Sequence, residues 1–257
     1  MSTCSQPYYD YRPDAISIAE WRVRVDLAAA YRLAAQQGWD DTIYTHISAR
    51  LPGRDDAFLI NRFGLRFDEI TASNLLAINT QGTALDPSAG QANPSGFAIH
   101  GAVHRARSDA HCVIHLHTEA SMAISALECG LLPLSQHALR FWNDLAYHDY
   151  AGLAFDATEQ KRLSTQLAQR SAMLLRNHGS LTCGRTVAEA YIRMDILERA
   201  CRIQLSAMAC NTPLHSPSEA TCQLTQQQWT CDPEPEGELE WPALLRKVWQ
   251  QDPNFCR

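Results

Sequence analysis

The feature that most constrains this chain is a short apolar run that ends in two histidines, from Cys112 to His117. Such a run favours a buried β-strand, in which residues two apart project from the same face. His115 and His117 would therefore point into one space. Neutral imidazole is the commonest metal ligand among side chains, and this pair would supply half of a tetrahedral site. A coincidental pair on a solvated strand face explains the spacing equally well, so a third ligand is needed to decide.

The composition indicates a soluble globular protein of the cytoplasm. The 257 residues are 46% hydrophobic and 19% charged, which suits one large domain or two small ones. A net charge of −6 without a cluster of Lys or Arg argues against nucleic acid as a partner. The chain has no run of about 18 apolar residues and no signal peptide, so we expect no membrane span. The nine cysteines, none spaced as Cys-x-x-Cys, indicate reduced thiols.

Hydrophobic periodicity and turn residues predict a mixed succession of helices and strands. Helices are expected over residues 16–37, 95–107, 118–128, 156–169, 186–210 and 241–251, with a helix or turn over 133–141. Strands are expected over 43–51, 57–60, 75–79, 110–117, 171–176 and 181–184, with a strand or loop over 145–150. Because the two types do not alternate strictly, the pattern favours a mixed or antiparallel sheet between helices.

Three parts of the chain differ in composition. Residues 1–15 are expected to form a loose arm, 16–210 a globular domain, and 211–257 a C-terminal extension. The extension has a Pro-rich linker or surface tail over 211–240 and a short final helix. At the helix ends we expect Gly38 as a C-cap, and Ser95 and Thr186 as N-caps.

A third histidine, His178, follows an apolar strand that ends near Leu175, and it precedes Gly179. Because glycine lets backbone approach closely, His178 fits the place of a third ligand; a turn histidine bonded to backbone is the alternative. Three histidines with open positions are typical of a catalytic metal site. The spacing of His100 and His104, four apart on a predicted helix, also suits a metal, although a solvated helix face explains it at least as well.

Taken together, these motifs resemble the class II aldolase/adducin family. The resemblance covers about residues 20–210 and rests on His115-Leu116-His117, on Arg176-Asn177-His178-Gly179, and on Glu189-Ala190 in a long helix. Further stretches are similar to the adducin-type branch in particular. These are Gly38-Trp39, Ile43-Tyr44-Thr45-His46-Ile47-Ser48, Leu59-Ile60-Asn61-Arg62-Phe63-Gly64-Leu65, Gly130-Leu131-Leu132-Pro133-Leu134 and Ala146-Tyr147-His148-Asp149-Tyr150.

The resemblance implies an α/β protein with a three-layer αβα fold around a central mixed, mainly antiparallel sheet. It also implies a divalent metal ion, usually zinc. The residues that match the metal histidines of the family are His115, His117 and His178. A homotetramer with fourfold symmetry, whose active sites lie between subunits, is the assembly that the resemblance implies.

The sequence departs from the sugar-phosphate aldolases of this family at several positions. Gly96 stands where they have an acidic residue four positions before the histidine that matches His100. Thr45-His46 replaces a Gly-Asn pair that helps to bind phosphate, and only Ser95 corresponds to a phosphate-binding serine. A tyrosine acid from a neighbouring subunit falls near His137. The resemblance therefore implies neither phosphate binding nor standard retro-aldol chemistry here.

With the acidic residue absent, we assign proton transfer to His46, to His137 or to a metal-bound water. Arg140 or Arg62 is expected to bind a substrate carboxylate through two hydrogen bonds. The candidates for substrate binding are Thr45, Asn61, Ser95 and Arg140.

Three functions fit these residues. The leading hypothesis is a metal-dependent lyase that acts on a small carbonyl or hydroxy-acid substrate through a metal-stabilised enolate, by aldol cleavage, decarboxylation or epimerisation. Since three imidazoles suit Fe(II) as well as Zn(II), the second is a non-heme iron oxygenase or decarboxylase on the same site. The third is a non-catalytic, adducin-like oligomeric interaction module.

Overall fold

The structure is a computed structural model that describes residues 6–152, 157–231 and 234–257. Its centre is a seven-stranded sheet with the order β3-β2-β1-β4-β7-β6-β5. The strands are β1 (His46–Arg50), β2 (Ala57–Ile60), β3 (Leu76–Asn79), β4 (Cys112–Leu116), β5 (Leu145–His148), β6 (Ala172–Leu175) and β7 (Gly179–Gly184). All neighbouring strands are antiparallel except β5 and β6, which are parallel. The expected mixed, mainly antiparallel sheet is therefore confirmed.

The apolar run that carries the two histidines forms the middle strand of this sheet. All five residues of β4 are buried, as a strand covered on both faces requires. β1 pairs with it on one side, with His46 opposite His115. β7 pairs with it on the other side, with Ser180 opposite Leu116. The neighbours of β4 therefore fix what surrounds the histidines.

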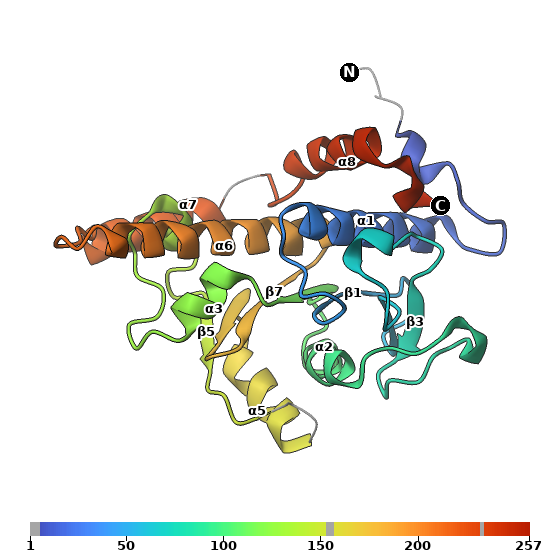
Figure 1. The fold of residues 1–257 in the computed structure, drawn as a ribbon, viewed down its shortest axis with the longest axis horizontal. Coiled ribbons are helices and arrows are strands. Elements are labelled where there is room, and N and C mark those ends of the chain that lie inside the picture. Colours follow the sequence, from blue (N-terminus) through green and yellow to red (C-terminus); the bar gives the residue numbers. More distant parts are fainter. Residues whose placement is uncertain (1–5, 153–156, 232–233) are drawn as a thin grey trace.

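Helices cover both faces of the sheet and complete three layers (Figure 1). One face carries α1 (Ile18–Gln36), α3 (Glu119–Ser125) and α6 (Val187–Ala209), and α8 (Glu240–Gln251) packs on the outer side of α1 and α6. The other face carries α2 (Pro94–Ala106) and α5 (Ala157–Leu167), and α4 (Gln136–Leu139) and α7 (Glu219–Thr230) pack against each other next to α6. The three-layer αβα architecture is thus confirmed, and no helix of the described chain is both long and apolar enough to cross a membrane.

Local sequence signals explain most helix ends. Gly38 adopts φ +68° two residues after α1, as expected of a glycine that ends a helix. The Thr186 side chain accepts a hydrogen bond of 3.0 Å from Glu189 N and caps α6, as predicted. The predicted N-cap at Ser95 is wrong, because α2 already begins at Pro94. Proline at a first helical position loses no hydrogen bond, which explains the earlier start.

The C-terminal segment differs from the linker that its composition suggested. Glu219–Thr230 form α7, whose N-cap is Ser218, within the stretch predicted to be a linker or tail. The predicted final helix is confirmed as α8, and its Trp241 and Leu245 are buried in the main core together with residues of α1. Tyr8, near the other end, is buried in the same core. The division of the chain into arm, domain and extension stays a prediction.

Candidate metal centre

Three histidines converge at one end of the sheet. β4 and β6 both run antiparallel to β7, so their C-terminal ends lie at the same edge. His115 lies in β4 and His117 just after it, while His178 lies in the short turn between β6 and β7. One nitrogen of each ring lies within 4.8 Å of the others. Such a group can hold a metal ion, as the spacing of the pair and the Gly179 neighbour predicted.

Hydrogen bonds at Nδ1 fix the orientation of the His115 and His117 rings. His115 Nδ1 lies 3.0 Å from the Ser180 carbonyl oxygen, and His117 Nδ1 lies 2.8 Å from Asp41 Oδ2. Both oxygens only accept, so each Nδ1 carries the proton and donates it. Nε2 of both rings then carries a lone pair, which is the form that binds a metal. Asp41 was not predicted from the sequence, because no spacing pattern links it to a residue so far along the chain.

The electrostatics of the site keep two of its imidazoles neutral. Burial, and then the neighbouring His178, holds the pKa of His115 well below its usual range. Burial, and then His117, lowers the pKa of His178 to about 4. Within the described chain, His117 Nε2 is buried without a hydrogen-bond partner. A largely buried set that includes two neutral imidazoles suits a cation.

Gly179 allows the close approach on which this arrangement depends. A Cβ at this position would lie 2.5 Å from the Leu116 carbonyl oxygen and 3.0 Å from His117 Cδ2. Any side chain would therefore push the turn away from β4 and move His178 away from the other two histidines. The preceding Asn177 has φ +56°, a left-handed conformation that Asn tolerates better than most residues.

His46 occupies the space that a side chain at position 96 would need. A Cβ on Gly96 would lie 2.5 Å from His46 Nδ1 and 2.6 Å from its Cγ. The His46 ring is 3% exposed, and neither of its nitrogens has a partner among the residues that the structure describes. Its Cα lies opposite that of His115, so both side chains leave the same face of the sheet. The two sequence departures, Gly96 and His46, are therefore one coupled change.

Thr45 and Asn61 present further unpaired groups near this edge. Thr45, at φ +65°, has a buried hydroxyl without a described partner, and the Asn61 amide nitrogen is likewise unpaired within the described residues. Tyr31 Oη lies 2.9 Å from Asn61 Oδ1 and fixes the amide orientation. Substrate binding by both residues stays a prediction. The Ser95 side chain lies outside the described part of the structure, so its role also stays a prediction.

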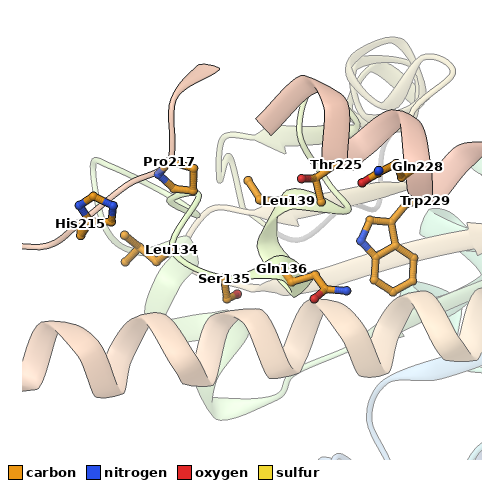
Figure 2. A pocket seen from close by; sticks show the side chains of 9 residues that line it. All are labelled: Leu134, Ser135, Gln136, Leu139, His215, Pro217, Thr225, Gln228 and Trp229. Atoms are coloured by element: carbon orange, nitrogen blue, oxygen red, sulfur yellow. The ribbon is translucent and has the colours of Figure 1, made fainter. Parts of the chain in front are cut away.

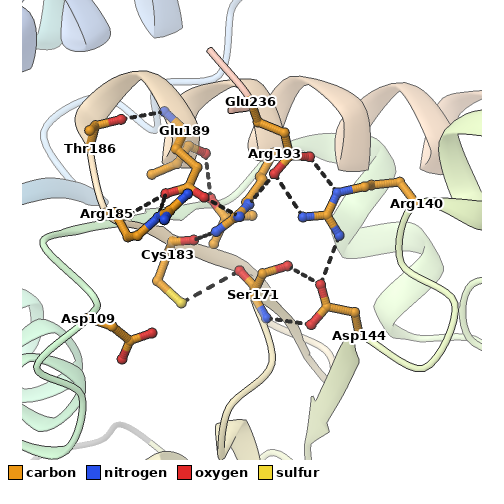
Figure 3. A network of polar contacts seen from close by, with 12 residues as sticks. Asp109, Arg140, Asp144, Ser171, Cys183, Arg185, Thr186, Glu189, Arg193 and Glu236 are labelled. Atoms are coloured by element: carbon orange, nitrogen blue, oxygen red, sulfur yellow. Dashed lines mark hydrogen bonds and ion pairs between the residues drawn. The ribbon is translucent and has the colours of Figure 1, made fainter. Parts of the chain in front are cut away.

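The Arg140 side chain is engaged in ion pairs within this chain, and its expected role in substrate binding stays a prediction. The side chain is 2% exposed and forms ion pairs with Glu236 and, at 2.8 Å, with Asp144 (Figure 3). Asp144 precedes β5 and also binds Ser171 at the start of β6, which is the end of the strands away from His178. The guanidinium is therefore occupied and distant from the histidines. The alternative, Arg62, is exposed next to Asn61.

His137 lies in α4, outside the histidine cluster of this chain. Its ring is half-buried, and burial, with the nearby Arg199 guanidinium, lowers its pKa although Asp195 opposes this. The resemblance placed this position in a site shared with a neighbouring subunit, so its role in proton transfer stays a prediction.

A hollow of about 700 Å³ opens between α4 and α7, where Trp229 and Gln136 face each other (Figure 2). Its lining comes from Leu134, Ser135, Gln136, Leu139, His215, Pro217, Thr225, Gln228 and Trp229. None of these residues belongs to the histidine cluster, so this hollow is separate from the candidate metal centre.

Comparisons with known proteins agree with this geometry. The family model for the class II aldolase and adducin N-terminal domain matches residues 25–205. Alpha-adducin of Mus musculus is 44% identical over 190 residues, which are 73% of this chain and 26% of that protein. The crystal structure of an aldolase II superfamily protein from Pseudomonas syringae has a TM-score of 0.91 at 45% identity and covers 95% of this chain and 98% of its own. L-fuculose 1-phosphate aldolase from Glaciozyma antarctica PI12 has a TM-score of 0.82 at 26% identity, covering 99% of this chain and 100% of its own.

Proposed function

This chain belongs to the class II aldolase and adducin family, and we propose that it is a metal-dependent lyase acting on a small carbonyl or hydroxy-acid substrate. The observation that carries the proposal is the convergence of His115, His117 and His178 at the edge of the sheet. Since no carboxylate of the described residues joins them there, the site keeps positions open for a substrate, as catalytic sites do. We further propose a cytoplasmic homotetramer, in which His137 serves a neighbouring subunit.

The three histidines fit a divalent cation by their chemistry. The proton on Nδ1 of His115 and of His117 is held by an oxygen behind each ring, which leaves Nε2 as the ligand atom. When bound there, zinc or iron(II) would supply Lewis-acid polarisation of a substrate oxygen. Ser180 and Asp41 fix the rings before the ion binds, which lowers the entropic cost of forming the site.

His46 is the residue that we propose for proton transfer. Burial, and then the nearby His117, lowers its pKa to about 3, so the ring is neutral near pH 7. Because a group with such a pKa is a weak base, we assign this role from the position of the ring and not from its pKa. His46 replaces the missing acid, because its ring fills the space beside Gly96. Thr45 and Asn61 would bind the substrate next to it, and the exposed Arg62 would bind a substrate carboxylate.

Two other functions keep support from specific observations. The 44% identity to alpha-adducin over most of the folded chain supports a non-catalytic interaction module. A cluster of three imidazoles supports iron(II) and an oxygen-dependent reaction. Metal content separates these alternatives, since an interaction module requires no ion.

The proposal is tested with protein purified without added metal. Elemental analysis identifies the ion, and a panel of hydroxy acids and hydroxycarbonyl compounds, followed by proton NMR, reports cleavage, decarboxylation or epimerisation. We expect bound zinc or iron, and turnover that falls about 100-fold or more in His46→Ala while the metal content is unchanged. Turnover equal to that of the wild type in His46→Ala would remove the assigned proton role. A metal-free protein that also fails to bind added zinc would favour the interaction module.

A further inference from the structure

A buried chain of hydrogen bonds runs behind the candidate metal centre. His104 Nδ1 lies 3.0 Å from the Ala110 carbonyl oxygen, and His104 Nε2 lies 2.8 Å from Ser48 Oγ. Ser48 Oγ in turn lies 2.6 Å from His100 Nδ1. The three side chains are 0 to 3% exposed, so solvent does not compete for these bonds. The sequence suggested a metal site or a solvated face for the two histidines of α2, and the structure gives them this different arrangement.

The Ala110 carbonyl at one end fixes the direction of every hydrogen bond in this series. A carbonyl oxygen only accepts, so His104 Nδ1 carries a proton, and neutral His104 then has a lone pair on Nε2. The Ser48 hydroxyl must donate to that lone pair, and its oxygen accepts from the Nδ1 proton of His100. Burial, and then the Arg50 guanidinium, lowers the pKa of His104 to about 3, which supports the neutral form. His100 Nε2 therefore carries a lone pair and acts only as an acceptor.

That acceptor has no hydrogen-bond partner among the residues that the structure describes. The His100 side chain is 0% exposed, and its ring faces the His46 ring at a centroid distance of 5.9 Å and an interplanar angle of 86°. The nitrogens of His46 are also unpaired in the described chain. The two rings are in edge-to-face contact, so nothing lies between them. Because buried polar groups are nearly always satisfied, the unpaired nitrogens indicate a small polar group that contacts both rings beside this contact.

We propose that His46 and His100 form a subsite for a hydroxyl group, which is that of water in the free protein and that of the substrate in the complex. A hydroxyl proton can be donated to His100 Nε2, while its oxygen accepts the single N–H of neutral His46. A fully ionised phosphate or carboxylate offers only acceptors and would oppose the lone pair on His100. The substrate part of this inference rests on the proposed function and makes it more specific. The subsite selects a hydroxyl-bearing compound and disfavours phosphate.

The first test measures the tautomers directly, without any catalysis. In metal-free protein labelled with ¹⁵N-histidine, we expect NMR to show His100 and His104 with the proton on Nδ1. The exposed His111 and His215 serve as controls and should show the mixture found in water. In Ser48→Ala, His100 loses the oxygen that fixes its tautomer and should show a mixture. A proton on Nε2 of His100 in the wild type would overturn the proposal.

The second test separates the acceptor from a purely structural role. His100→Asn keeps a donor for Ser48 but has nothing at the place of Nε2, whereas His100→Gln puts an amide oxygen there. With zinc-loaded protein, we expect His100→Asn to weaken glycolate binding about tenfold, as the loss of one buried hydrogen bond does, and His100→Gln to restore most of it. Methoxyacetate, which lacks the hydroxyl proton, should bind all three proteins equally, and sulfate, which is fully ionised near neutral pH and offers only acceptors, should not shift the His100 signal.

Equal glycolate binding by wild type and His100→Asn would overturn the subsite, and so would a shift of the His100 signal by sulfate. Zinc content is measured in each sample. A protein that binds no zinc contradicts the proposed function, while the tautomer measurement on metal-free protein still decides the hydroxyl subsite. The two claims can therefore fail separately.

Discussion

Single residues determine what this edge of the sheet can do. His46 and Gly96 depend on each other, because the imidazole fills the space directly beside the glycine Cα. Asp41 and Ser180 set the orientation of His117 and His115 without touching the open side of the cluster. The chemistry of the site thus depends on neighbours of the histidines as much as on the histidines themselves.

A pair of substitutions tests the coupling of His46 and Gly96. We expect Gly96→Ala to lower the free energy of unfolding by about 1–3 kcal/mol, since the added methyl overlaps the His46 ring. In a His46→Ala background, the same change should be neutral or stabilising by up to about 1 kcal/mol, because alanine favours a helix over glycine. Urea denaturation of the four proteins gives the coupling energy, and additive effects would contradict the shared space.

The buried His104 makes stability depend on pH in a predictable direction. Its pKa is about 3 in the folded state, below the value of about 6.5 in an unfolded chain. The unfolded state therefore binds the additional proton between these values, so stability rises with pH up to about 6.5 and is lost as the pH falls. Each such group contributes a slope of about 1.4 kcal/mol per pH unit.

Denaturation at a series of pH values between about 4 and 6 measures this slope. We expect the free energy of unfolding of His104→Asn to depend less steeply on pH, by the amount that corresponds to about one bound proton. This holds whatever the overall stability of the variant. His111→Asn, which removes an exposed histidine, should leave the slope as in the wild type. Equal slopes for the wild type and His104→Asn would show that His104 is accessible to protons in the folded protein.

At the scale of elements, the two ends of the strands carry different kinds of side-chain contact. The end near His178 gathers imidazole nitrogens that have no hydrogen-bond partner among the described residues, whereas the opposite end is closed by an ion-pair network. There, Glu236 binds Arg140 of the segment after α4 and, at 2.7 Å, Arg193 of α6. Burial would raise the pKa of Glu236, but the two guanidiniums hold it below its usual range. The network joins the C-terminal segment to the long helix and to the start of β5.

Glu236→Gln tests the structural role of this network. The change leaves two largely buried guanidiniums with one carboxylate fewer, and we expect it to lower the free energy of unfolding by about 3 kcal/mol. Glu238→Gln, at an exposed position, should change it by less than about 0.5 kcal/mol. Metal content should be unchanged in both, since the network lies at the other end of the strands. A stability equal to that of the wild type would contradict the role of Glu236.

Local sequence patterns predicted the helices and strands better than they predicted the contacts between these elements. Alternation and caps identified the strands around β4 and the start of α6, because these signals are local. The ion pair of Arg140 was not predicted, because its partner, Glu236, lies 96 residues away. The helix α7 was missed because its flanking prolines and many glutamines are also typical of linkers, and its stability comes from packing against α4.

At the scale of the whole molecule, the candidate centre depends on segments from most of the chain. Asp41 after α1, His46 in β1, Gly96 in α2, the β4 pair and His178 all meet at one edge of the sheet. The sequence predicted the three histidines because a strand places residues two apart on one face. It could not predict the contact of Asp41 with His117, which lies 76 residues further along the chain. Nor could it predict the roles of Ser48 and of the contact between His46 and Gly96, which arise only when α2 packs on β1.

The affinity for zinc tests the central claim most directly. Metal-free wild type, His117→Ala, Asp41→Asn and the control His215→Ala, which changes an exposed histidine, are titrated with zinc by calorimetry at constant pH. We predict that wild type and His215→Ala bind zinc equally, that Asp41→Asn binds about 10–100-fold more weakly, and that His117→Ala loses the site. Zinc binding by His117→Ala with the affinity of the wild type would contradict a metal centre formed by His115, His117 and His178.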